Sequence, residues 1–366
     1  MKASLVTLHR VFNYGSVLQT YATQRIFEDA GCEVEVVDYI TEQRTAKRIL
    51  LGKGAFFRLK NAKRIIRLPF KTASFLIKKR KFGKFLKKNC SLTKQKYIKA
   101  EDIIKNPPEA DIYITGSDQV WNSQYNEGVD KGFFLEYAPE NKKCIAFVSS
   151  FGKKALASDE KEITREYLKK YDALSVREDS AAEILKDLGY SSECLIDPTL
   201  QINKAEWQKI ASPRLIKQKY LILMLLYNED NGATDYARKI ADEKGLKLVK
   251  ISWELKKHKK VDKLMTHRTP EDFLSLFANA DFVVTNSFHG LAFSINFNRD
   301  FVVVPRKEFN SRLESLLRLT GLESRMAFSE SDAIEASRAD INYDNVNCIL
   351  EEERARVKKF VENSIK

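Results

Sequence analysis

The feature that most constrains the fold is a series of short, uninterrupted apolar runs, each followed by a segment with helical spacing. Examples of the runs are "ASLVTL", "DIYITG", "KCIAFVSS", "YLILMLLY" and "DFVVTN". Such runs predict strands that are covered on both faces, because a strand with one exposed face alternates apolar and polar residues. The intervening segment "SVLQTYATQRIFEDAG" places its apolar residues on one helical stripe. The pattern therefore predicts an α/β protein with parallel sheets and right-handed β-α-β crossovers.

Two such series follow one another, with a linker near "ASPRLIKQK". A chain of 366 residues is long enough for two domains that each bury a core. We expect an N-terminal Rossmann-like domain over residues 1–210, a C-terminal one over 211–340, and a closing C-terminal helix over 341–366. Two doubly wound domains would face a cleft, and open α/β sheets bind ligands at the carboxyl ends of their strands.

A basic segment over residues 43–100 interrupts the alternation. It contains 20 Lys or Arg and no Asp or Glu, so the rest of a chain of net charge +13 is net negative. Its spacing predicts a mostly helical insertion, broken near Pro69. One interpretation is a solvated helix pair packed on the body. A second, which we favour because large apolar residues alternate with the cations, is that residues 44–88 contact an anionic membrane surface. Nucleic acid is disfavoured, since no known binding module surrounds the run.

Cysteine and histidine spacing argue against several kinds of site. The five cysteines lie far apart and form no CxxC pair, which disfavours disulfides and zinc. No signal-type or 18-residue uncharged span is present, so we expect a cytoplasmic protein. The membrane interpretation of the basic segment adds the expectation that it is peripheral at the inner membrane face. We expect no metal and no cofactor, because His9, His258 and His267 show no ligand spacing with His289. P-loop, GxGxxG and GxSxG motifs do not occur either.

Polar residues follow two strands of the N-terminal half. In "NYGSVLQ", Gly15 and Ser16 fall at a predicted helix N-terminus, which favours an anion or a sugar hydroxyl, or else only a helix cap. In "TGSDQVWN", hydrogen-bonding side chains surround Trp121, a combination that suits a sugar. The alternative is a polar turn with Trp121 in the core.

Two further residues follow strands and could act on an anion. Arg177, after "ALSV", could grip a phosphate or carboxylate bidentately, or form a salt bridge to Glu178 or Asp179. His289, after "FVVTNS" and beside Gly290, lies at a predicted helix N-terminus. A histidine there could be a general acid, because its pKa lies near working pH, or only a capping or core residue.

Taken in order, "NYGSVLQTYA", "ITGSDQVWN", "SVREDS", "DPTL" and "TNSFHGLAFSINF" resemble the polysaccharide pyruvyl transferase family, from residue 13 to about 320. The resemblance implies a two-domain, GT-B-type fold. It also implies transfer of the pyruvyl group of phosphoenolpyruvate to two sugar hydroxyls, as a cyclic ketal. The acceptor would belong to a cell-surface polysaccharide, such as a capsule or exopolysaccharide, or to its lipid-linked oligosaccharide precursor.

The resemblance also implies roles for individual residues. His289 would be the acid and Arg177 an anion grip, with Ser287, Gly290 and Arg312 also on the donor side. Ser287 stands where ketal-forming members have Arg. The acceptor-side candidates are Asn13, Tyr14, Gly15, Ser16, Gln19, Ser117, Asp118, Gln119, Trp121 and Asn122. The main alternative hypothesis is a GT-B-type glycosyltransferase that uses a sugar nucleotide. A third hypothesis is a non-enzymatic, membrane-associated scaffold.

Overall fold

The computed structural model describes residues 1–52, 62–226, 229–253, 259–307 and 310–366, with only the backbone for 62–67. His258 therefore lies outside the described residues. The chain divides into two compact units: Met1–Pro198 together with Lys358–Lys366, and Thr199–Val357. The N-terminal stretch of the first unit runs to Pro198, and the boundary expected from the sequence lies at residue 210.

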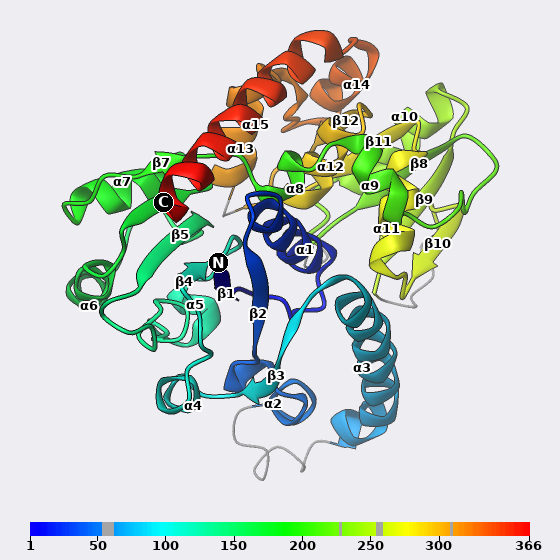
Figure 1. The fold of residues 1–366 in the computed structure, drawn as a ribbon. Helices are drawn as coiled ribbons and strands as arrows, with labels where there is room; N and C mark the ends of the chain where they lie inside the picture. Colours follow the sequence, from blue (N-terminus) through cyan, green and yellow to red (C-terminus); the bar gives the residue numbers. More distant parts are fainter. Residues whose placement is uncertain (53–61, 227–228, 254–258, 308–309) are drawn as a thin grey trace. The chain divides into compact units, whose positions relative to one another are not determined.

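The first unit contains a seven-stranded sheet in the order β3-β2-β1-β4-β5-β6-β7 (Figure 1). Its pairings are all parallel. The strands are β1 Lys2–Val6, β2 Glu33–Tyr39, β3 Leu92–Tyr97, β4 Ile112–Thr115, β5 Lys143–Ser149, β6 Ala173–Val176 and β7 Glu193–Cys194. The strand order reverses between β1 and β4, and in open α/β sheets ligands bind at the carboxyl ends of the strands at such a point.

Helices connect these strands and cover the sheet of the first unit. They are α1 Tyr14–Asp29, η1 Glu42–Arg44, α2 Ala46–Leu51, α3 Ala62–Asn89, α4 Ala100–Lys105, α5 Ser123–Asn126, α6 Ser158–Leu168 and α7 Asp179–Asp187. The short helix α8, Pro198–Gln201, lies where the two units divide.

The basic segment is helical but is not wholly an insertion. Helices α2 and α3 form the crossover from β2 to β3, and β3 pairs with β2 as an edge strand of the sheet. The predicted break at Pro69 is wrong, because α3 continues through that residue. A proline removes one helical N–H and can be accommodated by a kink. Further along α3, Phe82 is buried against Phe12 and Tyr14, with ring centroids 5.9 and 5.4 Å away.

The second unit contains a five-stranded parallel sheet in the order β10-β9-β8-β11-β12. Its strands are β8 Tyr220–Met224, β9 Lys247–Ser252, β10 Lys263–Thr266, β11 Phe282–Thr285 and β12 Asp300–Val303. Its helices are α9 Lys204–Ile210, α10 Ala233–Glu243, α11 Pro270–Ala278, α12 Phe288–Asn296, α13 Ser311–Thr320, η3 Glu323–Arg325 and α14 Glu330–Arg338. The last helix, α15 Tyr343–Ile365, contributes residues to both units.

The architecture confirms the predicted fold class, an α/β chain with two Rossmann-like domains. Each sheet is parallel and its central strands are buried, as the apolar runs indicated. Across the ranges given above, none of the helices combines the length and hydropathy that a bilayer crossing requires.

Candidate functional site

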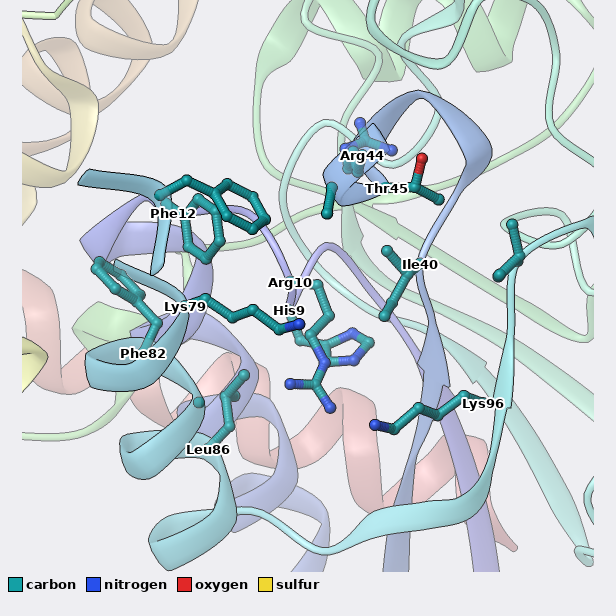
Figure 2. A pocket seen from close by; sticks show the side chains of 14 residues that line it. His9, Arg10, Phe12, Ile40, Arg44, Thr45, Lys79, Phe82, Leu86 and Lys96 are labelled. Atoms are coloured by element: carbon teal, nitrogen blue, oxygen red, sulfur yellow. The ribbon is translucent and has the colours of Figure 1, made fainter. Parts of the chain in front are cut away.

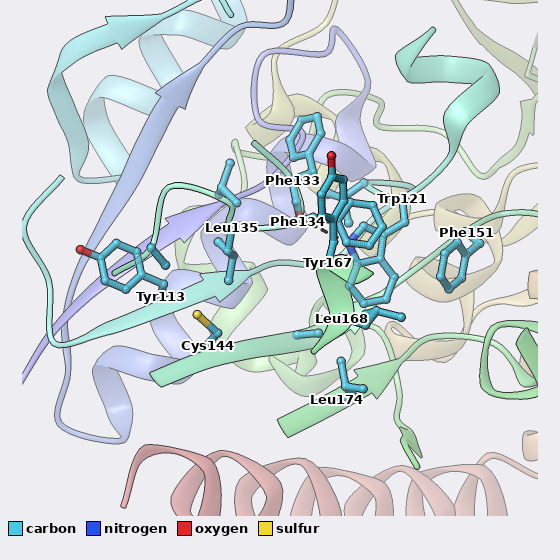
Figure 3. Close-up of a cluster of buried hydrophobic side chains, with 14 of the residues drawn as sticks. Tyr113, Trp121, Phe133, Phe134, Leu135, Cys144, Phe151, Tyr167, Leu168 and Leu174 are labelled. Carbon is cyan, nitrogen blue, oxygen red and sulfur yellow. Dashed lines mark hydrogen bonds between the residues drawn. The ribbon is translucent and has the colours of Figure 1, made fainter. Parts of the chain in front are cut away.

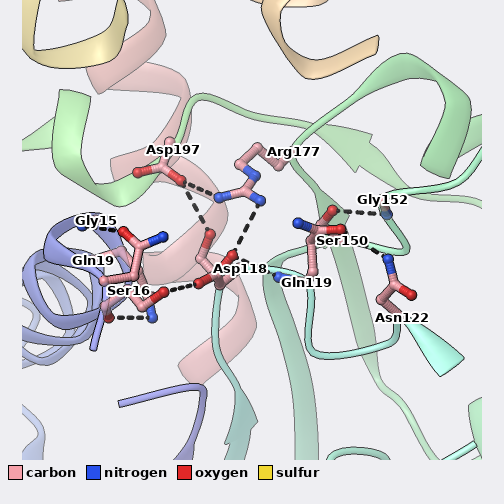
Figure 4. Close-up of polar contacts among 12 residues, drawn as sticks. Gly15, Ser16, Gln19, Asp118, Gln119, Asn122, Ser150, Gly152, Arg177 and Asp197 are labelled. Atoms are coloured by element: carbon pink, nitrogen blue, oxygen red, sulfur yellow. Dashed lines mark hydrogen bonds and ion pairs between the residues drawn. The ribbon is translucent and has the colours of Figure 1, made fainter. Parts of the chain in front are cut away.

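A buried ionic network lies at the carboxyl ends of the strands of the first unit (Figure 4). Arg177 directly follows β6, and its Nη1 donates to Asp197 Oδ2 at 2.8 Å. The same guanidinium lies 3.6 Å from Asp118 Oδ1 and 3.9 Å from Glu178 Oε2. Burial by itself would lower the pKa of Arg177, but the three carboxylates raise it above its ordinary value. Arg177 is therefore a permanent cation inside the unit.

This environment bears on the predicted role of Arg177 as an anion grip. Its side chain is 1 % exposed and its Nη1 already bonds the Asp197 carboxylate, so in this conformation the guanidinium is not open to a substrate anion. Of the two salt-bridge partners expected from the sequence, Glu178 does pair with Arg177 at 3.9 Å, but the hydrogen-bonded partner is Asp197. The geometry favours a role in which Arg177 holds neighbouring carboxylates in place and ionised.

Asp118 is the carboxylate of this network that reaches the surface. Its side chain is 9 % exposed, whereas those of Asp197 and Glu178 are fully buried. Ser16 Oγ, in the first turn of α1, donates to Asp118 Oδ2 at 2.5 Å. Asp118 also has a φ of 77°, a left-handed conformation that is uncommon for a residue other than glycine and is often found at functional sites. Among the acceptor-side candidates, Ser16 and Asp118 thus come together.

Other acceptor-side candidates hold the loops in position. Asn13 Oδ1 caps α1 by accepting from Gly15 N at 2.9 Å. Gln19 is buried and donates to Thr7 Oγ1 at 2.9 Å. Ser117 Oγ donates to Asp197 Oδ2 at 3.3 Å. Each of these side chains stabilises the turn that precedes or follows a strand.

Gln119 and Asn122 fix the next turn. Asn122 Nδ2 donates to Gln119 Oε1 at 2.8 Å, and Asn122 Oδ1 caps α5. Gly152 packs so closely on both side chains that a Cβ atom there would overlap Gln119, and its φ of 61° also favours glycine. These contacts bring "TGSDQVWN" together with "SSFG", residues 149–152 at the end of β5, into one loop cluster.

Trp121 lies in the hydrophobic core rather than at a sugar surface (Figure 3). Its ring stacks on Phe134 at 5.2 Å and lies 5.0 Å from the ring of Phe151. Its indole N–H donates to the Phe133 carbonyl at 3.2 Å, and the residue is 3 % exposed. Tyr14 is similarly buried. Stacking of a sugar on Trp121 is therefore incompatible with this conformation.

The donor-side candidates of the second unit lie together at the N-terminus of α12. Ser287 caps the helix by accepting from Gly290 N at 3.3 Å. Gly290 is required there because a Cβ atom would overlap Thr285 Oγ1 at the end of β11. The ring of Phe288 lies 5.2 Å from that of His289 and 6.0 Å from the Arg312 guanidinium carbon. His289 and Arg312 thus flank one aromatic ring, whereas Arg177 belongs to the other unit.

Two acidic residues near the strand ends, Asp38 and Asp197, were not predicted as site residues. Asp38, at the end of β2, accepts hydrogen bonds from His9 at 3.0 Å and from Arg10 at 2.8 and 2.6 Å. Asp197 was detectable, because it ends the predicted strand "ECLID" at the sheet edge. Asp38 was also detectable from its place at the end of "CEVEVVDY", but its partners were not.

Two parallel, Rossmann-like sheets with polar clusters at their carboxyl edges define a GT-B-type α/β protein. A sequence model of the family described as polysaccharide pyruvyl transferase matches residues 13–308, and the chain belongs to that family. This confirms the resemblance found in the motifs. No curated protein sequence matches the chain.

One solved structure with a TM-score of 0.50 supports the fold, and a second is similar at a slightly lower score. The S. aureus MnaA–UDP structure is 11% identical over 96% of this chain and 90% of its own, with a TM-score of 0.50. A putative UDP-N-acetylglucosamine 2-epimerase from Listeria monocytogenes is 13% identical over 99% of this chain and 94% of its own, with a TM-score of 0.49. At these identities the likeness concerns the fold alone.

Proposed function

We propose that this chain transfers the pyruvyl group of phosphoenolpyruvate to two hydroxyls of a sugar in a cell-surface polysaccharide or its lipid-linked precursor, forming a cyclic ketal. The observation that carries the proposal is the family match over residues 13–308, which includes the His289 motif. The grouping of Ser287, His289 and Arg312 in one unit supports it.

The reaction needs a proton donor, cationic contacts and a proton acceptor. Protonation of C3 of phosphoenolpyruvate makes C2 cation-like, and a sugar hydroxyl oxygen then bonds to C2. The C2–O bond to phosphate breaks, and the second hydroxyl oxygen bonds to C2 to close the ketal. Of the two hydroxyl protons released, one balances the proton on the new methyl group and the other leaves with the inorganic phosphate.

Each need is matched by a residue described above. His289 donates the proton to C3, a general-acid role that suits an imidazole at neutral pH. Arg312 and the N–H groups at the start of α12 bind the donor's phosphate or carboxylate. Asp118, the partly exposed carboxylate of the first unit, accepts a hydroxyl proton. Arg177 is a positioning residue that keeps Asp118 ionised.

Donor binding tests the proposal without an identified acceptor. Phosphoenolpyruvate should raise the melting temperature of the protein by mass action, and UDP-sugars should not. Arg312→Met should remove the phosphoenolpyruvate shift, whereas Arg338→Met, an exposed arginine of the same unit paired with Glu243, should keep it. Stabilisation by sugar nucleotides alone would instead favour the GT-B glycosyltransferase. That alternative gains support from Ser287, which removes the arginine expected beside His289.

We also propose that the basic segment holds the enzyme at an anionic membrane surface on the cytoplasmic side. Within the described part of the chain, Phe70, Leu76 and Ile77 of α3 are exposed large apolar residues. They lie among the lysines of the same helix. Apolar side chains interleaved with cations are typical of surfaces that bind lipid head groups.

A further inference from the structure

A pocket of about 280 Å³ lies in the first unit, under helix α3 (Figure 2). Its walls come from the β1–α1 loop, the residues after β2, one face of α3 and the edge strand β3. The lining residues are His9, Arg10, Phe12, Ile40, Arg44, Thr45, Ala46, Phe75, Lys79, Phe82, Gly83, Leu86, Lys96 and Ile98. The pocket therefore exists only because the basic segment folds back over the carboxyl ends of β1 and β2.

The polar part of the lining is cationic. It contains Arg10, Arg44, Lys79 and Lys96 and no carboxylate. Figure 2 shows Lys79 and Lys96 extending toward Arg10 from opposite sides. Asp38 neutralises Arg10 from behind the pocket. Lys79 and Lys96 form no ion pair with any residue that the structure describes, so the pocket has an excess of positive charge.

Arg44 adds a cation that is poorly compensated. Its guanidinium donates to Thr41 Oγ1 at 2.7 Å and to Asn126 Oδ1 at 3.0 Å, both neutral atoms. Burial lowers the pKa of Arg44, an effect that the more distant charges of Asp130 and Asp118 offset only in part. A bound anion would supply the missing counter-charge.

The other part of the lining is apolar and lies where α3 packs on the loop before α1. Phe75 and Phe82 are buried, and their rings contact Phe12 at 5.3 and 5.9 Å. Ile98, at the rim, is 45% exposed. The volume is close to the lower end for small-ligand pockets, which suits a head group and the first part of a hydrocarbon chain rather than a whole lipid.

The pocket is connected to the polar network at Asp118 within the same unit. The loop that lines the pocket with His9, Arg10 and Phe12 continues into α1, where Ser16 donates to Asp118. Asn126, which accepts from Arg44, donates to the Val120 carbonyl in the loop after Asp118. A ligand in the pocket would therefore contact the same loops that position Asp118, the carboxylate that we assign to the acceptor hydroxyl.

We propose that this basic pocket binds the phosphate or diphosphate of a lipid-linked acceptor, with its first hydrocarbon units against Phe12, Phe75 and Phe82. That the ligand is the acceptor of the reaction rests on the proposed function, but its binding to the pocket does not. Phosphate oxygens match Arg44, Lys79 and Lys96, which pair with no carboxylate of the described residues, and the phenylalanines match a hydrocarbon chain. The occupant would thus present its sugar toward Asp118.

Farnesyl diphosphate, a soluble diphosphate ester of a short hydrocarbon chain, is a direct probe. In isothermal titration of the full chain it should bind, and inorganic pyrophosphate should bind at least tenfold more weakly. Lys79→Glu/Lys96→Glu should weaken farnesyl diphosphate binding at least tenfold. The matched control, Lys87→Glu/Lys88→Glu, has the same net charge but changes exposed lysines of α3 outside the pocket, and should bind like the parent.

A larger residue in place of Gly83 would fill the pocket while leaving its charged side chains unchanged. A Cβ atom there meets nothing within 4 Å, and Gly83 lines the pocket. Gly83→Leu should therefore fold, as circular dichroism would verify, and lose farnesyl diphosphate binding, whereas Gly83→Ala should keep most of it.

Three results would overturn the proposal: no binding by the parent, equal loss in the two lysine pairs, or equal affinity for pyrophosphate and farnesyl diphosphate. The last would indicate a free-phosphate site. Melting-temperature shifts with phosphoenolpyruvate, measured on the same variants, test the donor site separately from the pocket. Farnesyl diphosphate binding without any phosphoenolpyruvate shift would leave the pocket standing and remove the donor assignment.

Discussion

Removal of the Arg177 cation should destabilise the first unit strongly. Arg177→Met keeps much of the side-chain volume but leaves Asp118, Glu178 and Asp197 without their shared counter-charge. Removing one partner of a buried ion pair costs about 3–5 kcal/mol, because the remaining charge is desolvated and unpaired. The Arg177 side chain is 1 % exposed, so this range applies rather than the roughly 0–1 kcal/mol of a surface pair.

Amide hydrogen exchange by mass spectrometry would report this loss in the unit concerned. A cost of about 3–5 kcal/mol accelerates exchange in β5 and β6 by roughly 10²- to 10⁴-fold, at 1.4 kcal/mol per factor of ten. In the variant, buried carboxylates without a cation are more readily protonated. The loss of stability relative to the parent should therefore become smaller as the pH is lowered from 8 to 5.

The control for this prediction is Arg338→Met, which removes an arginine that is 67% exposed and pairs with Glu243. It should change exchange less than tenfold. If Arg177→Met behaved like Arg338→Met at all pH values, the network would not be held together by that cation. The positioning role assigned to Arg177 would then be refuted.

Three further predictions follow from local geometry. Gly290→Ala should lower the melting temperature, at a cost of about 1–3 kcal/mol, because the new Cβ overlaps Thr285, whereas Gly83→Ala should stabilise α3 by about 0.5–1 kcal/mol; equal effects would contradict both. Burial would raise the pKa of Asp38, but bonds from His9 and Arg10 lower it, so this carboxylate stabilises the fold above about pH 4 and loses that contribution on acidification. The difference between the urea midpoints of the parent and Asp38→Asn should therefore become smaller below about pH 4. A difference that stays constant would contradict the stabilising role of ionised Asp38. Replacing the exposed lysines of residues 44–88 by Gln should reduce sedimentation with anionic vesicles while circular dichroism stays unchanged; unaltered sedimentation would reject the membrane role.

The buried central strands were predictable, whereas the edge strands β3 and β10 were not. Strands such as β8 and β11 are buried at every position, so their sequences are continuous apolar runs. Strand β3, "LTKQKY", has three consecutive exposed polar residues because it lies at the sheet edge, and β10, at the edge of the other sheet, is buried at Met265 alone. Neither leaves an apolar run in the sequence, which is why the segment ending in β3 was taken for an insertion.

The site was predictable where it depends on local sequence. The position of His289 at a helix N-terminus, beside a required glycine, follows from the strand and helix pattern around it. The hydrogen-bonded partner of Arg177 does not, because Asp197 lies 20 residues away and is brought close by the pairing of β6 with β7.

Trp121 illustrates the opposite error, in which local polarity misled. The polar neighbours of Trp121 suggested a sugar platform, yet Gln119 and Asn122 bond each other within the turn. The ring instead packs on Phe134 and Phe151, residues whose proximity only the tertiary fold reveals.

The most direct test of the account is release of inorganic phosphate from phosphoenolpyruvate in the presence of a lipid-linked oligosaccharide. The parent should release phosphate only when the acceptor is present. His289→Ala should lower the rate by about 10²- to 10⁴-fold, the usual contribution of a general acid, while keeping the phosphoenolpyruvate shift in melting temperature. Equal release by the parent and His289→Ala would contradict the central claim that this histidine protonates the donor.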